Sequence, residues 1–514
     1  MEMPTGRGGE RAADAAELRA DGVRPALRAP VALALLIGGY WLLAWHRSNL
    51  AYLDYVDGYY LYAAHRVAQG AVLYRQIMGV QPPGIYLAGA ALFRIHDSID
   101  AARAYALLVH SATVLLVFVI AWRTFRRDGV ALLAATLYSL APYSLVWSRT
   151  FDPNPLVGCL GLATLLALSG GTTSRAALAG CLGALALATK VWYVPVGAAS
   201  VLYMARHARG LLLPYFGALV AVLGIVFAAG TAAAGGAFWR GLLAQDASGL
   251  SGSWLLASLV DVGIRDLPLV LLGLLGLPLL RRGGAAGVLV CWYSIGACAV
   301  LLATVKSGTF APVFQFAEPG LAIAAAAYLA AQLPIAAESV STAQQFTGTG
   351  ERATRVVRRR PPLLPGLLGL GFLATAYAAA AATPPPSDAP VRAIVRAIET
   401  HSRPGSALLS PPYYLYLTGR RAFGEYADIN LWDAADRAGD PAAHVWVLRA
   451  EGAVSHGTIP IVVQDMRVKR LGSGVLYALL QAHYQRLPID DPAPVDRRVV
   501  LWVPRGHVAS GTRG

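Results

Sequence analysis

The sequence predicts a polytopic α-helical membrane protein of about eleven spans, followed by a C-terminal extracytoplasmic α/β domain. Three observations predict this fold class. Hydrophobic residues make up 56% of the 514 positions, charged residues only 14%, and the mean hydropathy is +0.51, whereas soluble domains carry about 25% charged residues. The apolar residues gather in long stretches, and charge density rises again after residue 384. This composition excludes an ordinary soluble enzyme.

Mostly apolar runs that approach the length needed to cross a bilayer, about 20 residues, define the expected spans. Residues 1–28, which precede them, hold five Arg and five acidic residues without an apolar run. That composition predicts a disordered cytosolic tail and no signal peptide. The spans are expected at 29–45, 101–122, 129–147, 155–170, 176–189, 190–205, 210–232, 266–280, 285–304, 320–337 and 362–383.

Arginines in short loops predict the orientation, because cytosolic loops of membrane proteins are rich in Lys and Arg. With a cytosolic N-terminus, the inner loops together hold 13 Arg and three acidic residues. Much of the net charge of +14 is therefore a topology signal. The Arg clusters are split and have no aromatic platform, which argues against nucleic acid as a partner. The inner loops are 123–128, 170–175, 206–210, 281–284 and 338–361.

The charge rule also places residues 46–100 outside as one long loop. Residues 82–95 are apolar but too short to span, and they begin with Pro-Pro. If they crossed the membrane, the Arg-rich loops would move outside. We therefore expect two helices on the outer membrane face, 57–69 and 82–95, in a multi-pass protein of the bacterial inner membrane.

Residues 384–514 follow a Pro-rich linker and lie outside by the parity of the spans. Short apolar runs alternate there with helical stretches at 391–401 and 474–484, a pattern typical of a small α/β domain. The runs are 406–409, 444–448, 459–463 and 499–503.

Two acids in the first outer loop could carry chemistry. Asp54 and Asp57 are three residues apart, so on a helix they share a face. One could act as a general base that takes a proton from an acceptor hydroxyl. The alternative is an ordinary solvated helix start, since acids favour helix N-termini.

Basic residues at the outer ends of spans could bind a phosphate. Arg149 can hold a phosphate bidentately, or it can pair with Asp152 on the surface. Lys190 and Lys306 are two of only three lysines in the chain, and lysine binds phosphate as a point charge. They could instead extend to the membrane interface. Glu318 could pair with Lys306 or stay exposed.

Other site types find no support in the sequence. The four cysteines, Cys159, Cys181, Cys291 and Cys298, are scattered in apolar stretches without zinc-ligand spacing. HExxH, GxxxxGK[ST] and GxSxG motifs are absent, so no zinc hydrolase, ATP-driven enzyme or serine hydrolase is indicated.

The stretch 54–86 (DYVDGYYLYAAHRVAQGAVLYRQIMGVQPPGIY) resembles the first extracytoplasmic loop of GT-C fold glycosyltransferases. The most similar group is family 39, which contains protein O-mannosyltransferases and the lipid A aminoarabinose transferase. The sequence shares the family's tyrosine-rich helix, the Gly after it, the Tyr-Arg pair and the Pro-Pro that starts the next helix. It departs from the family at two positions. Val56 stands before Asp57 where the family has a second acid, and Gln76 stands where the family has an acid after Tyr-Arg. The segments 306–319 and 410–433 also resemble parts of the family.

The resemblance implies a polyprenyl-phosphate sugar as donor and a hydroxyl on a glycan, lipid or protein as acceptor, at the outer face. The reaction would invert the anomeric carbon, in synthesis of a cell-envelope glycan or glycoconjugate. Asp57, or else Asp54, would be the base, and Arg149, Lys190 and Lys306 would hold the phosphate. No cofactor is implied, and a divalent metal is not supported because two oxygen ligands are missing. Further substrate contacts are expected from Tyr59, Tyr60, Tyr74, Arg75, Asp152, Gln315 and Glu318.

Two other classes remain open at this point. A lipid or polysaccharide transporter would show charges in mid-span and internal repeats, and neither is evident. A non-catalytic scaffold could keep the fold without activity, and Val56 in place of an acid is compatible with that role.

Overall fold

The computed structural model describes most of the chain outside the N-terminal tail. The described residues are 28–45, 55–79, 81–243, 250–306, 311–332, 363–381, 388–424, 436, 441–465, 474–488 and 499–506. The predicted cytosolic tail 1–28 lies outside them but for its last residue, as do Asp54 and the whole of the Arg-rich loop 338–361.

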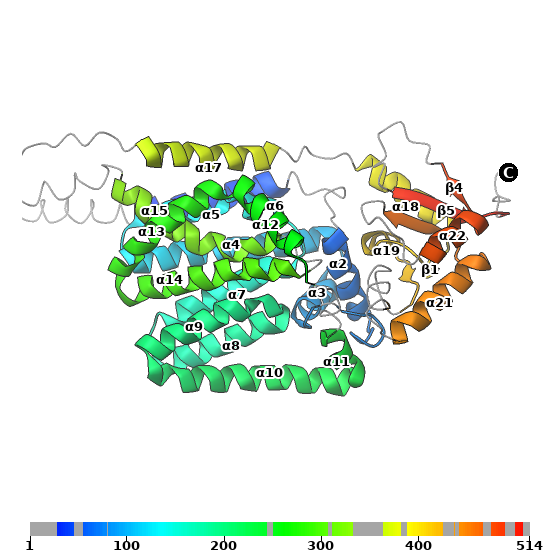
Figure 1. The fold of residues 1–514 in the computed structure, drawn as a ribbon, viewed down its shortest axis with the longest axis horizontal. Coiled ribbons are helices and arrows are strands. Elements are labelled where there is room, and N and C mark those ends of the chain that lie inside the picture. Colours follow the sequence, from blue (N-terminus) through cyan, green and yellow to red (C-terminus); the bar gives the residue numbers. More distant parts are fainter. Residues whose placement is uncertain are drawn as a thin grey trace, which may run out of the picture.

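A bundle of long apolar helices forms the larger part of the molecule (Figure 1). Within the described residues every expected span overlaps helix, and α5 and α6 are separated by a break directly before Pro142. The bundle consists of the helix Arg28–Trp45, α4 (Ile99–Phe125), α5 (Asp128–Ser139), α6 (Pro142–Trp147), α7 (Pro153–Leu168), α8 (Thr173–Thr189), α9 (Val194–His207), α10 (Leu212–Ala234), α13 (Leu267–Leu280), α14 (Gly284–Ala299), α15 (Glu318–Gln332) and α17 (Leu363–Ala381).

By length and composition, four helical segments within the described residues are suited to cross a membrane. They are Arg28–Trp45, Ile99–Phe125, Arg209–Ala234 and Leu267–Val305. Four shorter apolar helices accompany them. The membrane character is thus confirmed, and the count of eleven crossings stays a prediction.

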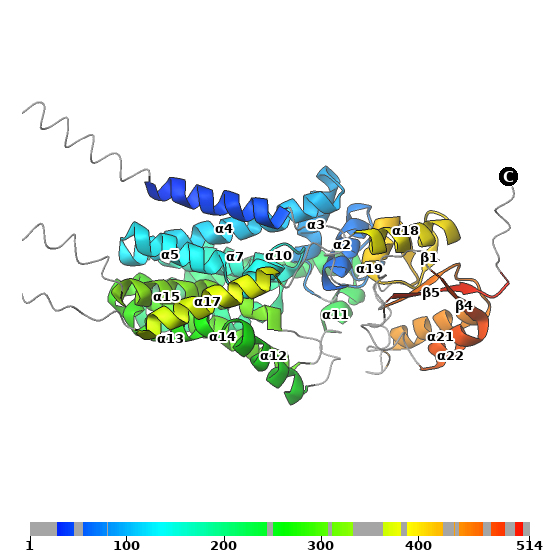
Figure 2. The same ribbon diagram turned by 90° about the horizontal axis from the view of Figure 1, so that it is seen from above.

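Short helices and turns gather at one end of the bundle. The expected helices of the first outer loop are present as α2 (Tyr55–Ala68) and α3 (Gly84–Ile95), and α11 (Gly236–Leu243) lies near them (Figures 1 and 2). Short elements elsewhere in the bundle are η2 (Val191–Tyr193), η3 (Arg209–Leu211), α12 (Gly252–Arg265), η5 (Arg281–Gly283), η6 (Val300–Val305) and η7 (Ala311–Phe316).

Side-chain caps fix where several helices begin. The Ser98 side chain accepts a hydrogen bond from the Ala101 amide at the start of α4. Thr172 caps α8 in the same way through the amide of Arg175. Such caps satisfy backbone N–H groups that have no partner inside the helix. They therefore fix the ends of the bundle helices locally.

The C-terminal part combines helices with two small sheets, beside α2 and α3 (Figure 2). Strands β1 (Ala407–Leu408) and β2 (Arg421–Ala422) pair in parallel, and β5 (Val499–Pro504) lies between β3 (Val462–Asp465) and β4 (Tyr484–Leu487) in an antiparallel sheet. Val462 is paired with Trp502, and Gln485 with Val503. The helices are α18 (Ala389–His401), α19 (Pro412–Thr418), α21 (Pro441–Ser455) and α22 (Gly474–His483).

One expectation for this region is wrong. The apolar run 444–448 does not form a strand; it lies inside α21. Its flanks, PAA and RAEGAVS, extend the run with strong helix formers such as Ala, Arg and Glu. A short apolar run cannot by itself distinguish a buried strand from a helix.

A shared hydrophobic core joins the C-terminal part to the first outer loop. Buried side chains of α2 and α3, among them Tyr62 and Ile85, pack with Ile398, Leu415 and Leu501 of the C-terminal part. A backbone bridge between Leu409 and Val462 links the two small sheets. The C-terminal part is therefore packed on the helix that carries Asp57.

Candidate functional site

Asp57 lies in the first turn of α2 and is buried, with 1% of its surface exposed. Its Oδ1 accepts a hydrogen bond of 2.6 Å from the backbone N–H of Phe151. Its Oδ2 lies 2.8 Å from Nη1 of Arg103, which is equally buried. The structure thus rejects a solvated helix start for Asp57, because both carboxylate oxygens have partners inside the protein.

Arg103 is a site residue that sequence reasoning missed. It lies in the second turn of α4, and its Nη1 also donates to the backbone carbonyl of Arg149 at 2.7 Å. One guanidinium therefore holds both the acid of α2 and the loop that follows α6. The signal was present in the sequence: a single charge at the start of an apolar span is costly there and is usually functional.

The loop 148–155 connects this ion pair to Lys190. Asp152 caps α7 by accepting the Asn154 amide at 2.7 Å. The Asn154 side-chain oxygen in turn accepts a hydrogen bond of 2.8 Å from Nζ of Lys190. Lys190 lies in the turn after α8, where burial lowers its pKa and the charge of Asp152 partly opposes that shift. The loop therefore links the acid of α2 to a buried amine.

Lys306 lies next to the same turn. Its ammonium nitrogen is 5.8 Å from the ring centroid of Trp192, which belongs to η2 directly after Lys190. Its backbone pairs with Leu250 in an isolated β-bridge. A continuous line of contacts thus runs from Asp57 through loop 148–155 to Lys190 and Lys306. Arg149 belongs to this line and is 4% exposed.

The tyrosines of the first loop are packed together. Rings of Tyr59, Tyr60 and Tyr86 lie within 6.3 Å of one another by centroid distance. Burial raises the pKa of Tyr59 and Tyr60 well above the usual 10.0, so both hydroxyls are neutral. The Tyr59 hydroxyl donates to the backbone carbonyl of Met78. The three rings therefore form one packed aromatic group next to Asp57 in the sequence of α2 and at the start of α3.

The Tyr-Arg pair of the first loop is divided. Tyr74 is buried in a left-handed conformation (φ 66°), and its hydroxyl donates to the Gln81 carbonyl at 2.6 Å. Arg75 is exposed. Gln76, where the family has an acid, accepts the Val72 amide at 2.8 Å. Tyr74 therefore shapes the loop, whereas Arg75 is available to solvent.

Glu318 and Gln315 both lie against the start of α6. Glu318 is fully buried, so the exposed carboxylate is wrong. Its oxygens accept hydrogen bonds from the backbone N–H groups of Tyr143 and Ser144, at 2.9 and 3.0 Å. Gln315 donates to the Tyr143 carbonyl at 2.9 Å. Both side chains hold the first residues of α6. Glu318 and Ser144 are 174 positions apart in the sequence.

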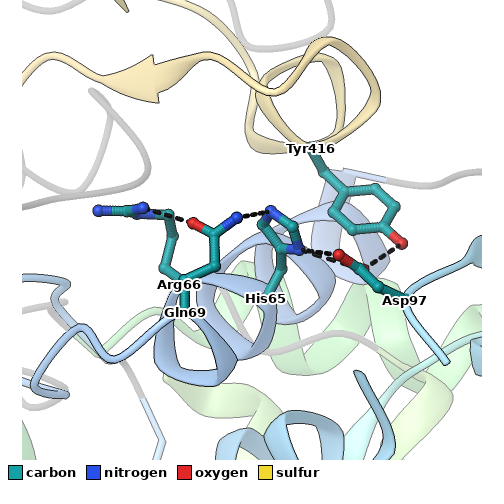
Figure 3. Close-up of polar contacts among 5 residues, drawn as sticks. All are labelled: His65, Arg66, Gln69, Asp97 and Tyr416. Carbon is teal, nitrogen blue, oxygen red and sulfur yellow. Dashed lines mark hydrogen bonds and ion pairs between the residues drawn. The ribbon is translucent and has the colours of Figure 1, made fainter. Parts of the chain in front are cut away.

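A polar cluster at the edge of α2 joins the C-terminal part (Figure 3). His65 Nδ1 lies 2.9 Å from an Asp97 carboxylate oxygen, and its Nε2 lies 2.8 Å from the Gln69 amide nitrogen. The Tyr416 hydroxyl of α19 donates to Asp97 at 3.4 Å, and its ring packs edge-on against His65 at 5.2 Å. Arg66 donates to Gln69 at 2.6 Å. The cluster thus connects α2 to α19.

Acidic and imidazole side chains do not gather as metal ligands in the described residues. No three His, Cys, Asp or Glu side chains lie together there in a way that could hold a metal ion. Asp57 already has Arg103 and Phe151 as partners, a donor set that disfavours a cation.

Comparisons with known proteins agree with this architecture. A family model described as dolichyl-phosphate-mannose-protein mannosyltransferase matches residues 80–232. ArnT from Cupriavidus metallidurans, bound to undecaprenyl phosphate, superposes with a TM-score of 0.62 and 12% identity, over 91% of this chain and 97% of that one. No match is found among the curated proteins.

The fold is also similar to that of an archaeal enzyme. The Archaeoglobus fulgidus oligosaccharyltransferase in its apo form superposes with a TM-score of 0.54 and 11% identity, over 89% of this chain and 73% of that one. At such low identity the likeness concerns the fold. The chain has the GT-C fold of membrane glycosyltransferases, which confirms the resemblance seen in its first loop.

Proposed function

We propose that the protein transfers a sugar from a polyprenyl-phosphate donor to a hydroxyl acceptor at the outer face of a bacterial inner membrane. One observation carries the proposal: in a GT-C fold, contacts join the acid Asp57 to the buried amine Lys190 through a single loop. The solved structure of ArnT with undecaprenyl phosphate supports the choice of donor class.

The reaction needs a base and a cation, which would lie at the two ends of the line of contacts that runs from Asp57 to Lys190 and Lys306. The acceptor oxygen would attack the anomeric carbon from the face opposite the phosphate, and the bond from carbon to the phosphate oxygen would break with inversion. Lys190, Lys306 and Arg149 would stabilise the negative charge on the departing lipid phosphate, which is the electrostatic contribution that usually dominates catalysis. A base would take the acceptor proton.

Asp57 is our first choice of base, with Asp54 as the alternative. For Asp57 to take the proton, one of its oxygens must exchange Phe151 or Arg103 for the acceptor hydroxyl. Asp54 lies outside the described residues. Its place three residues before Asp57 keeps it as the second candidate.

Transfer from radiolabelled polyprenyl-phosphate sugars by the full chain in proteoliposomes tests the proposal. We expect Asp57→Asn or Asp54→Asn to abolish transfer, and Lys190→Met to weaken donor binding. Glu399→Gln, at an exposed position of α18, is the matched control and should be fully active. Full activity of both aspartate variants would refute a carboxylate base in this loop.

The burial of Asp57 favours one alternative, a non-catalytic GT-C scaffold. Both of its oxygens are bound within the protein and 1% of its surface is exposed. A scaffold would show no transfer from any donor. A scaffold would still need the Asp57–Arg103 ion pair for its stability. The cellular phenotype of Asp57→Asn would then follow the loss of protein stability.

A further inference from the structure

Helix α6 is held at its first residues by side chains from three other elements. The Glu318 carboxylate at the start of α15 accepts the Tyr143 and Ser144 amides and, at 2.6 Å, the Ser144 hydroxyl. Gln315 of η7 donates to the Tyr143 carbonyl, and the Tyr143 hydroxyl donates to Asp261 of α12 at 2.6 Å. A helix of one and a half turns has little stability of its own, so these contacts determine where α6 lies.

Helix α6 leads directly into the loop that serves Asp57. The Ser148 amide donates to the Ser144 carbonyl, and the Thr150 amide donates to the Trp147 carbonyl at 3.1 Å. The next residue, Phe151, supplies the N–H that binds Asp57. With these turn hydrogen bonds in place, a displacement of α6 is transmitted to the Phe151 amide.

We propose that Glu318 is a positioning residue for Asp57, acting through Ser144, α6 and the backbone of loop 148–155. The inference rests on the proposed function, in which Asp57 is the base. It replaces the sequence expectation of Glu318 as a substrate contact with a role that needs no contact with substrate.

An isosteric substitution removes one of the two acceptor oxygens of Glu318. In Glu318→Gln, an amide NH₂ group replaces one oxygen and points at donors that need an acceptor. The Ser144 amide then loses its 3.0 Å acceptor and keeps only a 3.4 Å contact with the other oxygen, so the hold on the start of α6 weakens and α6 can shift. Because a misplacement of about 1 Å can cost roughly 100-fold in rate, we expect kcat to fall by about 10- to 100-fold while KM for the donor stays within about twofold.

A double-mutant cycle with Ser144→Ala tests whether Glu318 acts through α6. Ser144→Ala removes only the hydroxyl donor, so we expect a smaller loss of kcat. The double variant should lose less than the product of the two single effects, because both variants disturb the same contact. Glu399→Gln is the matched control, and hydrogen exchange of a peptide spanning residues 142–152 should rise in Glu318→Gln but not in this control.

The outcomes separate the two proposals. Wild-type protein without transfer from any polyprenyl-phosphate sugar would refute the proposed function, whatever the variants do. If the wild type is active, three results together would overturn the positioning role and indicate direct substrate contact. These are a higher KM for the acceptor in Glu318→Gln, unchanged hydrogen exchange in residues 142–152, and effects on kcat that multiply with those of Ser144→Ala. Unchanged kcat in Glu318→Gln would also overturn it.

Discussion

Asp57 and Arg103 form an ion pair of 2.8 Å in which both side chains are 1% exposed. The two residues come from different helices, α2 and α4, and Arg103 also binds the carbonyl of the loop that contacts Asp57 from the other side. The pair therefore fixes α2 on the bundle.

Removing one partner of this pair should destabilise the protein strongly. A buried charge left alone costs about 3–5 kcal/mol, so Arg103→Met should lower the free energy of unfolding by about that amount. Denaturant unfolding in detergent measures it. The double variant Asp57→Asn/Arg103→Met should recover part of the loss, and a stability equal to wild type in Arg103→Met would contradict the structural role of the pair.

Donor binding should weaken at alkaline pH through Lys190. Burial lowers the pKa of its amino group below the usual 10.5, so in the folded protein the charge is lost at a lower pH than for an exposed lysine. A neutral amine no longer attracts a phosphate, and affinity should fall as pH rises through that lowered pKa. Lys190→Arg, whose guanidinium stays charged, should flatten the alkaline limb; an unchanged limb in titrations of affinity against pH would contradict the assignment.

The start of α3 should tolerate no side chain. A Cβ on Gly84 would lie 2.4 Å from the Thr189 hydroxyl and 2.8 Å from the Ala188 carbonyl, directly beside Lys190. Gly84→Val should therefore push α3 and α8 apart, cost about 1–3 kcal/mol by overpacking, and reduce donor affinity. Gly129→Ala is the control, since nothing lies within 4 Å of a Cβ there, and thermal unfolding with a donor-binding assay checks both.

The cluster around His65 should couple α19 to α2. Tyr416→Phe removes the hydroxyl that reaches Asp97 but keeps the ring against His65. We expect a loss of at most about 1 kcal/mol, the usual size of such a hydrogen bond, whereas His65→Ala should also increase hydrogen exchange in α19. Equal exchange in wild type and His65→Ala would show that the shared apolar core alone holds this contact.

The sequence allowed correct prediction of features that depend on local composition. Apolar runs located the helices of the bundle and the two helices of the first loop, α2 and α3. Asp57, loop 148–155 and Lys190, which the sequence singled out separately, lie in contact, and their role in the reaction stays a prediction.

Features that depend on distant partners could not be predicted. Glu318 contacts residues more than 170 positions away, and no pattern near Glu318 indicates α6 as its partner. Arg103 was not singled out because one arginine hardly lowers the hydropathy of the span predicted at 101–122. The run 444–448 was misassigned because strand and helix share the same short apolar signal.

The packing of α2 on the C-terminal part has a consequence for engineering. A Cβ on Gly58 would lie 2.2 Å from Cβ of Tyr413, and the Tyr62 hydroxyl accepts the Ala422 amide at 2.7 Å. The surface of α2 is thus complementary in shape to the C-terminal segment that contains Tyr413 and Ala422. Chimeras that exchange this segment between GT-C proteins should fold only when the matching face of α2 is transplanted with it.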